Sequence, residues 1–142
     1  MEIKPVDARF AVSPQITPAD IPAIAAAGFR KVISNRPDGE ESGQPETDDI
    51  RRAAEEAGLS FEHIPVAGGA FSPEQVAAFA QARRSADGPV LAFCRTGTRS
   101  ITLDTLANVD SLSVEDRLSR AAQAGYDLTG QRQRMLQSSE GE

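Results

Sequence analysis

The chain has 142 residues, enough for one domain that buries its own core without a metal ion or a disulfide. Its net charge of −6 excludes the broad basic surface typical of nucleic-acid-binding proteins, and no apolar stretch approaches the roughly 18 residues of a membrane span. The single cysteine excludes an internal disulfide. One cysteine and one histidine are together too few ligands for a zinc site. We expect one domain over residues 1–137, a flexible tail at 138–142, and no metal or cofactor.

Strand and helix signals alternate along the chain, which is typical of an α/β fold. Strands are predicted at residues 9–13, 31–34, 59–66 and 89–93. Helices are predicted at residues 17–28, 47–57, 72–85, 101–109, 113–125 and 128–136. Proline directly after Thr17 and after Ser72 marks two helix starts, and Gly28 and Gly58 mark two helix ends. We expect a three-layer sandwich in which helices flank a central, mostly parallel sheet of four to five strands.

The last predicted strand ends at the only cysteine. Its residues, Pro89 to Phe93, form a continuous apolar run, as expected for a strand that is covered on both faces. Cys94 would then lie at the carboxyl end of a strand and close to the amino end of a helix. Only a thiolate is nucleophilic, and helix-terminal N–H groups and nearby positive charge favour that form. We interpret Cys94 as a nucleophile; the alternative is a small residue of the core.

The residues after Cys94 are suited to bind an anion. The backbone N–H groups of residues 95–99 are expected to converge on one point, and Gly97 permits a backbone conformation that other residues avoid. The guanidinium of Arg99 offers a planar fork for an oxyanion, and Ser100 is expected to donate a hydrogen bond to the sulfur. Cys94 and Arg99 are therefore the expected catalytic residues. The expected anion-binding loop consists of Arg95, Thr96, Gly97, Thr98 and Ser100.

The hexapeptide Cys94-Arg95-Thr96-Gly97-Thr98-Arg99 resembles the Cys-Arg-x-Gly-x-Arg active loop of rhodanese-type sulfurtransferases. Three further segments are similar to the small bacterial sulfurtransferases that are related to the phosphatase-like domain of beta-lactamase hydrolase-like proteins. These segments are Phe10–Ile16, Asn35–Glu40 and His63–Val66. The resemblance covers residues from about 5 to 110, and it implies a fold like that of the tyrosine phosphatases.

The loop and the fold that the resemblance implies point to different chemistries. Tyrosine phosphatases place five residues between the cysteine and the arginine, whereas four separate Cys94 from Arg99. A shorter loop has one N–H donor fewer and a narrower opening, which suits a persulfide sulfur better than a phosphoryl group. Such phosphatases also carry an aspartate general acid on the loop after the preceding strand; here residues 65–71 contain no acidic residue. Both departures favour sulfur transfer.

Polar residues after the other predicted strands form the expected surroundings of the loop. Asp38, Glu40 or Glu41 could replace the missing general acid, and the alternative is a solvated turn. His63 could assist the thiolate, but we favour a half-buried strand residue whose ring bonds a backbone carbonyl. Phe71 and Val66 could form an apolar wall of the opening. The expected supporting residues are Asn35, Arg36, Asp38 and His63.

We therefore expect a cytoplasmic, rhodanese-like sulfurtransferase. In this hypothesis the Cys94 thiolate takes the outer sulfur of thiosulfate or of a low-molecular-weight persulfide, and the Cys94 persulfide passes it to an external thiol such as glutathione, or to cyanide. The lack of a second cysteine fits transfer to an external acceptor. One alternative is a phosphatase of the tyrosine or dual-specificity type that acts through a phosphocysteine. Another is a non-catalytic module that senses anions or redox state.

The two ends of the sequence carry weaker signals. Residues 1–5 lack the apolar core of a signal peptide, which agrees with the expected cytoplasmic location. No partner among nucleic acids or membranes is expected. Residues from about 110 onward carry helix signals but no chemical motif, so packing on the sheet and contact with a second copy in a homodimer both remain open.

Overall fold

The computed structural model describes the backbone of residues 1–140 and the side chains of residues 1–136. A five-stranded sheet with the order β1-β2-β5-β3-β4 forms its centre. The strands are β1 (Lys4–Asp7), β2 (Phe10–Ser13), β3 (Lys31–Ser34), β4 (Ser60–His63) and β5 (Val90–Phe93). β1 is antiparallel to β2, and the other four strands are parallel to one another. The predicted, mostly parallel sheet is confirmed.

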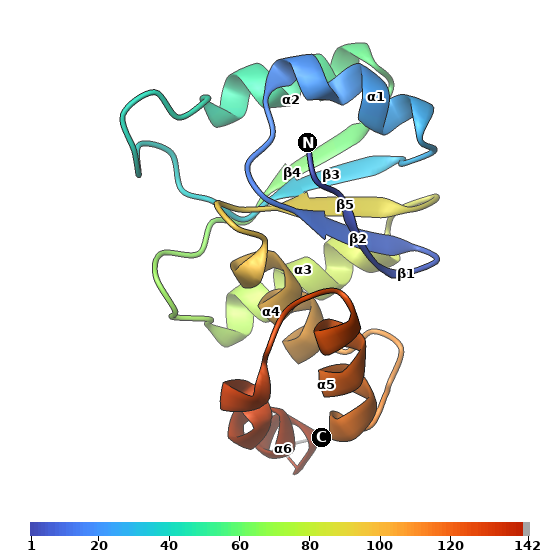
Figure 1. Ribbon diagram of the computed structural model, residues 1–142, viewed down its shortest axis with the longest axis vertical. Helices are drawn as coiled ribbons and strands as arrows, with labels where there is room; N and C mark the ends of the chain where they lie inside the picture. Colours follow the sequence, from blue (N-terminus) through green and yellow to red (C-terminus); the bar gives the residue numbers. More distant parts are fainter. Residues whose placement is uncertain (141–142) are drawn as a thin grey trace.

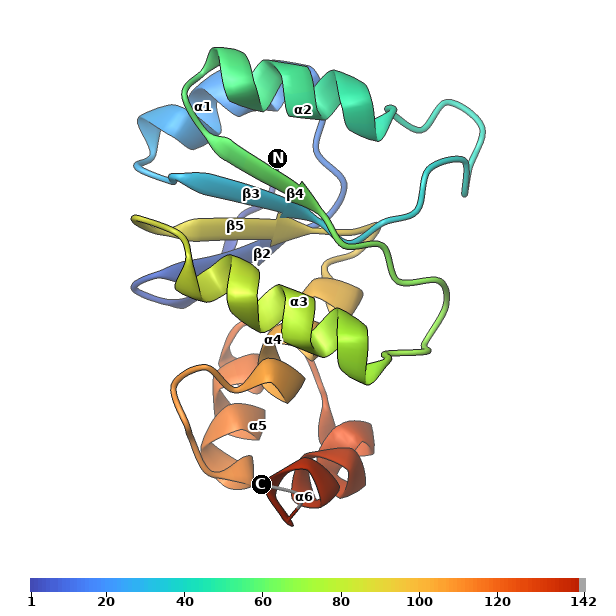
Figure 2. The same cartoon turned by 180° about the vertical axis from the view of Figure 1, so that it is seen from behind.

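Helices cover both faces of the sheet (Figure 1). One face carries η1 (Pro18–Asp20), α1 (Ile21–Ala26) and α2 (Thr47–Glu56), and the other carries α3 (Pro73–Arg84) and α4 (Thr98–Ala107). The remaining elements are α5 (Val114–Gln123), η2 (Thr129–Gln131) and α6 (Arg132–Glu140). Figure 2 shows these last helices beyond α4, on the side away from the sheet. The three predicted layers are therefore present, and α5 and α6 extend the second helical layer.

Each face of the sheet has its own hydrophobic cluster. Ile16, Ile24 and Ile50 pack with Val32 and Leu91 under α1 and α2. On the opposite face, another cluster joins the sheet to α3, α4 and the helices that follow. Its fully buried members include Phe10, Phe79, Ile33, Ile101 and Met135. All four residues of β5 are buried, as expected for a central strand with helices on both sides.

The register of the parallel strands brings their carboxyl ends to one edge. Ser34 pairs with both Phe93 and His63, and Phe93 also pairs with Ser13. The residues that follow these four strand ends, Cys94 among them, therefore lie along a common line. In Figure 1 the loops after β3, β4 and β5 all leave the sheet on the same side. Ligands bind at this edge in open α/β sheets, so the fold itself places Cys94 where a site is expected.

Several boundaries differ from those predicted. β1 was not expected, because its Lys-Pro-Val-Asp sequence carries charge and proline, which edge strands tolerate. α4 begins at Thr98 and not at Ile101, because the left-handed Gly97 already caps it. The last helix extends to Glu140 and so overlaps residues 138–140 of the expected tail. Residues 141–142 lie outside the described part of the chain.

The residues after position 110 pack on the same domain. Leu118, Ala121, Tyr126, Leu128 and Met135 belong to the hydrophobic cluster that includes α3 and α4. The contact is made mainly with α4 and β1, and not with the broad face of the sheet. In the described part of the chain, no helix has the length and apolar character to cross a membrane.

Candidate active site

Cys94 directly follows β5 and lies at the amino end of α4. Its side chain is buried, with 1% of the residue exposed, and its Sγ accepts a hydrogen bond from the backbone N–H of Gly97 at 3.1 Å. Gly97 caps α4 in a left-handed conformation, with φ of 93°. The predicted placement of Cys94 between a strand and a helix is therefore confirmed. The sulfur is buried, but it is bonded to a backbone N–H group and not surrounded by hydrocarbon alone.

Two hydrogen bonds hold the carbonyl groups of the loop away from the sulfur. The Thr96 carbonyl accepts a hydrogen bond from the Tyr126 hydroxyl at 2.8 Å, and the Arg95 carbonyl accepts one from the Gln15 N–H at 3.3 Å. In a trans peptide the N–H points opposite to the carbonyl. The N–H groups of Gly97 and Thr96 are thereby turned to the inner side of the loop. This is the geometry that an anion-binding loop requires.

Other polar groups of the loop bond to one another. The hydroxyls of Thr96 and Thr98 lie 3.0 Å apart, and the Thr98 N–H donates to the Thr96 hydroxyl at 3.4 Å. Ser100 is buried, and its hydroxyl makes no hydrogen bond with any described residue. The predicted bond from Ser100 to the sulfur is therefore absent, which corrects that expectation: burial at the start of α4 brings the residue into the core without directing its hydroxyl to Sγ.

Arg99 is held in place by two neighbouring loops. Its Nη1 and Nη2 donate to the two carboxylate oxygens of Glu40 at 2.8 and 2.9 Å, and Nη1 also donates to the Val66 carbonyl at 2.7 Å. The bond to Glu40 is the main reason that the pKa of Arg99 is raised, and the nearby Cys94 adds to the rise. The edge formed by Nε and the second N–H of Nη2 donates to no further carboxylate or carbonyl among the described residues, and the Cys94 side chain is an additional hydrogen-bond partner of the guanidinium. Apart from this contact with the nucleophile, two parallel donors remain for an oxyanion.

Arg36 fixes the loop that carries Glu40. Its guanidinium is buried and donates from Nε to Glu40, from Nη1 to Gln15 and from Nη2 to Glu41, at 2.8 to 2.9 Å. Glu41 also pairs with Arg95 at 2.8 Å. Each nitrogen of Arg36 thus has a protein partner, and the residue joins the segment that carries Gln15 to the loop that carries Glu40 and Glu41.

The remaining predicted residues of the surroundings have structural partners. Asp38 accepts hydrogen bonds from the backbone N–H and the hydroxyl of Thr47 at 2.8 Å each, at the start of α2, and these bonds lower its pKa. His63 Nε2 lies 2.8 Å from the Arg36 carbonyl oxygen, in the carbonyl contact that we favoured for this ring. Asn35 donates to the Ile64 carbonyl at 2.9 Å, while its Oδ1 is buried without a partner among the described residues.

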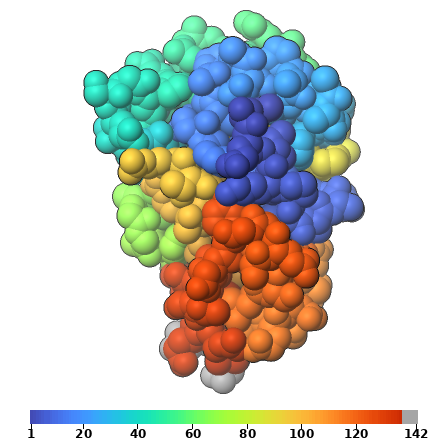
Figure 3. All heavy atoms as spheres, viewed as in Figure 1, coloured from blue at the N-terminus to red at the C-terminus, as the bar shows by residue number. Residues whose placement is uncertain are grey.

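A cavity of about 380 Å³ lies at the carboxyl edge of the sheet, and Cys94, Asn35, Asp38 and His63 are not among its lining residues. Its lining consists of Arg36, Glu40, Glu41, Gly68, Arg95 and Arg99. In Figure 3 the gold surface of the loop after β5 lies beside the turquoise surface of the loop after β3. Three arginines and two glutamates give this cavity a strongly ionic character. Within the residues whose side chains are described, no group of three or more His, Cys, Asp or Glu side chains could hold a metal ion.

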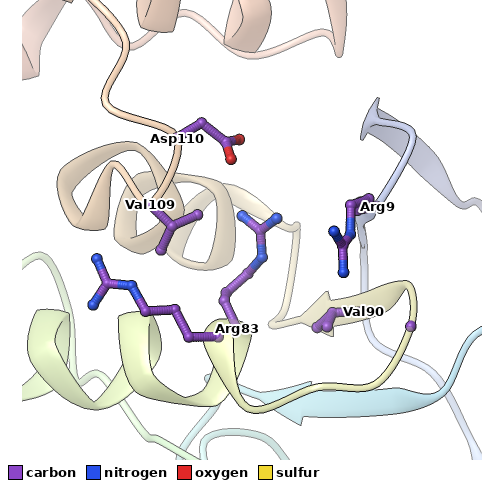
Figure 4. Close-up of a pocket in the computed structure, with 7 residues that line it drawn as sticks. Arg9, Arg83, Val90, Val109 and Asp110 are labelled. Carbon is purple, nitrogen blue, oxygen red and sulfur yellow. The ribbon is translucent and has the colours of Figure 1, made fainter.

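A second cavity, of about 220 Å³, lies at the opposite edge of the sheet, before β2 and β5 (Figure 4). Arg9 and Arg83 line it together with Val90, Val109 and Asp110. No cysteine or histidine is among its lining residues. The nucleophile and the free arginine edge are thus both at the carboxyl edge.

Sequence reasoning missed two residues that shape the site. Tyr126 holds the loop from a segment to which no role was given, and Gln15 bonds both the Arg95 carbonyl and Arg36. Both act through bonds between segments that are distant in sequence. A local pattern cannot reveal such bonds.

Comparison with known proteins assigns the chain to a family. The family model described as "Beta-lactamase hydrolase-like protein, phosphatase-like domain" matches residues 2–111. A beta-lactamase hydrolase-like protein of Agrobacterium fabrum is 37% identical over 116 residues, which are 82% of this chain and 26% of that protein. One from Xylella fastidiosa is 35% identical over 130 residues, 90% of this chain and 30% of the relative. The chain therefore spans about a quarter to a third of the length of these relatives.

Solved structures agree on the fold. A protein of Neisseria meningitidis, described only as a candidate phosphatase, is 37% identical with a TM-score of 0.85, and the match covers 97% of this chain and 99% of that chain. Tk-PTP in its active form is 23% identical with a TM-score of 0.74, covering 99% and 97% of the two chains. These matches include the residues after position 110, beyond the range that the sequence resemblance covered.

The comparisons bear on the choice between the phosphatase and the sulfurtransferase hypotheses. The family and the solved structure from Neisseria are described as phosphatase-like, and the fold is that of the tyrosine phosphatases. None of the matches reported above is described as a sulfurtransferase. They support the phosphatase alternative better than the rhodanese-like sulfurtransferase that we expected from the shortened loop.

Proposed function

Because this chain belongs to the family of phosphatase-like domains of beta-lactamase hydrolase-like proteins, we propose that it is a cysteine-dependent phosphatase acting through a phosphocysteine at Cys94. One observation carries the proposal. The sulfur is bonded to a loop N–H at the amino end of α4, while Arg99 is held so that two of its N–H groups remain for an oxyanion. A nucleophile and a fixed anion site thus lie together.

The proposed reaction has two steps. The Cys94 thiolate attacks the phosphorus of a phosphoric monoester, the Sγ–P bond forms, and the P–O bond breaks with its electron pair on the departing oxygen. Water then attacks the phosphocysteine and an O–P bond forms. The S–P bond breaks as the thiolate leaves, a proton of the attacking water passes to solvent, and inorganic phosphate is released.

The loop and Arg99 would stabilise the phosphoryl oxygens in both steps. Inward N–H groups of residues 96 and 97 and the free edge of Arg99 act as fixed donors, which need no reorganisation during the reaction. Glu40 and the Val66 carbonyl have the role of positioning Arg99. A lysine at position 99 would keep the charge but lose both the parallel donors and the bidentate bond to Glu40.

Release of inorganic phosphate from 4-nitrophenyl phosphate tests this proposal. We expect turnover by the wild type, none by Cys94→Ser, and a loss of roughly 10²- to 10³-fold in Arg99→Lys. Rapid acid quenching during turnover should reveal one added phosphoryl group on Cys94 by intact mass. Lack of phosphate release that depends on Cys94 would reject the function.

Sulfur transfer is the second candidate, and one observation favours it: four residues, and not five, separate Cys94 from Arg99. The thiolate would take the outer sulfur of thiosulfate, with sulfite leaving as an anion. We would then expect thiosulfate to add the mass of one sulfur atom to Cys94, and cyanide to remove it as thiocyanate. Parallel assays with thiosulfate and 4-nitrophenyl phosphate on one preparation decide between the two candidates.

A further inference from the structure

The carboxylates nearest the anion site all accept hydrogen bonds from neighbouring residues. Departure of an alkoxide or phenoxide normally requires a proton from a positioned acid, which contributes roughly 10²- to 10⁴-fold to the rate. The acidic residues of the 35–46 loop that we considered for this role are Asp38, Glu40 and Glu41. Their partners in the structure decide whether any of them holds a proton to give.

Glu40 is nearest to the reacting groups, because it is bonded to Arg99. Both of its carboxylate oxygens accept from Arg99, and one also accepts from Arg36. These bonds lower the pKa of Glu40 to about 2, the one to Arg99 most strongly. A pKa of about 2 leaves roughly one molecule in 10⁵ protonated at pH 7. Its geometry makes it an anchor for Arg99.

The other two carboxylates also accept hydrogen bonds from neighbouring residues. Glu41 lies 2.8 Å from Nη2 of Arg36 and 2.8 Å from Nε of Arg95, so it bridges two guanidinium groups. Asp38 faces the start of α2, where it accepts two hydrogen bonds from Thr47. Asp38 is thus turned to α2, whereas Glu41 lines the cavity beside Arg99 with its Oε1 held by the two guanidinium groups.

The neutral groups around the loop have fixed partners as well. The Tyr126 hydroxyl donates to the outward carbonyl of Thr96, and His63 Nε2 is in contact with the Arg36 carbonyl. The loop after β4, which borders the cavity at Gly68, carries no acidic residue between positions 65 and 71. Within the described part of the site, each candidate proton donor thus has at least one hydrogen-bond or ion-pair partner.

We infer that this site acts on phosphates whose leaving group departs as a stable anion without being protonated, namely acyl phosphates and phosphate esters of acidic phenols. The inference rests on the proposed phosphatase function and specifies its substrate class. In the first step the P–O bond breaks and the oxygen keeps the electron pair, with no proton transferred from the protein. Phosphates of ordinary alcohols, including phosphoserine and phosphothreonine, would then react slowly, because an alkoxide is a poor leaving group.

A series of leaving groups tests the inference. The substrates are acetyl phosphate, 4-nitrophenyl phosphate and phenyl phosphate, each corrected for the rate with Cys94→Ser. Phenol has a pKa near that of the tyrosine side chain, about 10, and 4-nitrophenol is more acidic. We expect kcat/KM to fall roughly 10²- to 10⁴-fold from 4-nitrophenyl to phenyl phosphate, which is the share of the rate that an acid would supply. Values within a few-fold of each other would overturn the inference.

Glu40→Gln and the matched variant Glu41→Gln separate positioning from proton donation. We expect each to change kcat/KM for the two aryl phosphates by the same factor, because neither residue protonates the leaving group. A selective loss with phenyl phosphate in either variant would identify a general acid and overturn the inference. Absence of turnover that depends on Cys94 with all three substrates would instead reject the phosphatase function itself.

Discussion

The hydroxyl of Tyr126 and the sulfur of Cys94 bond to opposite ends of one peptide group. That group joins Thr96 to Gly97: its carbonyl accepts from Tyr126 at 2.8 Å, and its N–H donates to Sγ at 3.1 Å. Tyr126 follows α5, far from the loop in sequence. The helical segment after position 110 thus fixes the orientation of the N–H group that contacts the nucleophile.

Tyr126→Phe removes the hydroxyl while keeping the ring, so it tests this relationship. We expect a loss of about 1 kcal/mol in stability, as for a typical hydrogen bond, and a lower kcat with little change in KM. The physical reason is that the Thr96–Gly97 peptide is then free to rotate away from the sulfur. Steady-state kinetics at a temperature well below unfolding measure the effect; an unchanged kcat would show that Tyr126 serves stability alone.

Gly97→Ala should be one of the most damaging small substitutions in the loop. A Cβ there would overlap the Tyr126 hydroxyl oxygen, and the φ of 93° is unfavourable for any other residue. We expect a cost of roughly 1–3 kcal/mol from the backbone conformation, with the overlap added to it. In the Tyr126→Phe background the nearest ring atom, Cζ, would be 3.1 Å away, so the substitution should cost less. Urea unfolding of the wild type, the two single variants and the double variant measures this coupling. Strictly additive losses of unfolding free energy would contradict it.

The stability that Glu40 provides should depend on pH with a defined sign. The pKa of Glu40 is lowered from the usual value of 4.5 to about 2, chiefly by Arg99, so the folded protein holds the ionised form. Its contribution is therefore complete above pH 4.5 and is lost as the pH falls toward 2. We expect the wild type to exceed Glu40→Gln by about 1–2 kcal/mol at pH 7 and at pH 5, after allowance for solvent screening, and by less at pH 3.5. A stability difference between the wild type and Glu40→Gln that widens as the pH falls would contradict this prediction.

Much of the fold follows from local sequence signals. Strand β3 has the bounds that its apolar residues predict, and Ser72 and Gln75 form the capping box that opens α3. The position of Cys94 after β5 also followed from a run of apolar residues. Such features depend on neighbours in sequence, and for that reason they were predictable.

The finer geometry of the site depends on contacts across the fold. The bonds from Arg99 to Glu40 and from Tyr126 to Thr96 join residues 59 and 30 positions apart. Loop conformations set by Arg36 and by glycines decide these pairs, and no periodicity in the sequence encodes them. The same limitation explains why Ser100 was assigned a bond to the sulfur that its buried hydroxyl does not make.

Arg36 should be essential for the folded loop, although the cavity it lines contains two other arginines. Its guanidinium is 4% exposed and binds Gln15, Glu40 and Glu41. Arg36→Lys keeps one charge but cannot reach three acceptors, so we expect a loss of roughly 2–3 kcal/mol. Arg95→Lys is the matched control, because its side chain is 65% exposed and a surface pair contributes less than about 1 kcal/mol. Equal losses in the two variants, measured by urea unfolding, would contradict this assignment.

The buried pair of Arg83 and Asp104 links α3 to α4 within the core. Asp104 is 1% exposed and bonds Arg83, with Arg120 at 3.7 Å. Asp104→Asn should cost roughly 3–5 kcal/mol, because it leaves a buried guanidinium without its counter-ion. The double variant Arg83→Met, Asp104→Leu should lose much less, since replacing both charges by apolar side chains removes the desolvation cost together with the attraction. If the double variant loses as much unfolding free energy as the two single variants lose together, the ions do not interact.

The same pair predicts a pH effect opposite in sign to that of Glu40. Burial raises the pKa of Asp104 from 3.8 to about 6 despite the two arginines, so the folded protein binds a proton there more readily than the unfolded chain does. The resulting stabilisation is complete below pH 3.8 and is lost as the pH rises through 6. We therefore expect the wild type to gain stability relative to the double variant as the pH falls from 7 to 4.5. Urea unfolding of both proteins at these two pH values measures the difference, and a relative loss would mean that the arginines outweigh the cost of burial.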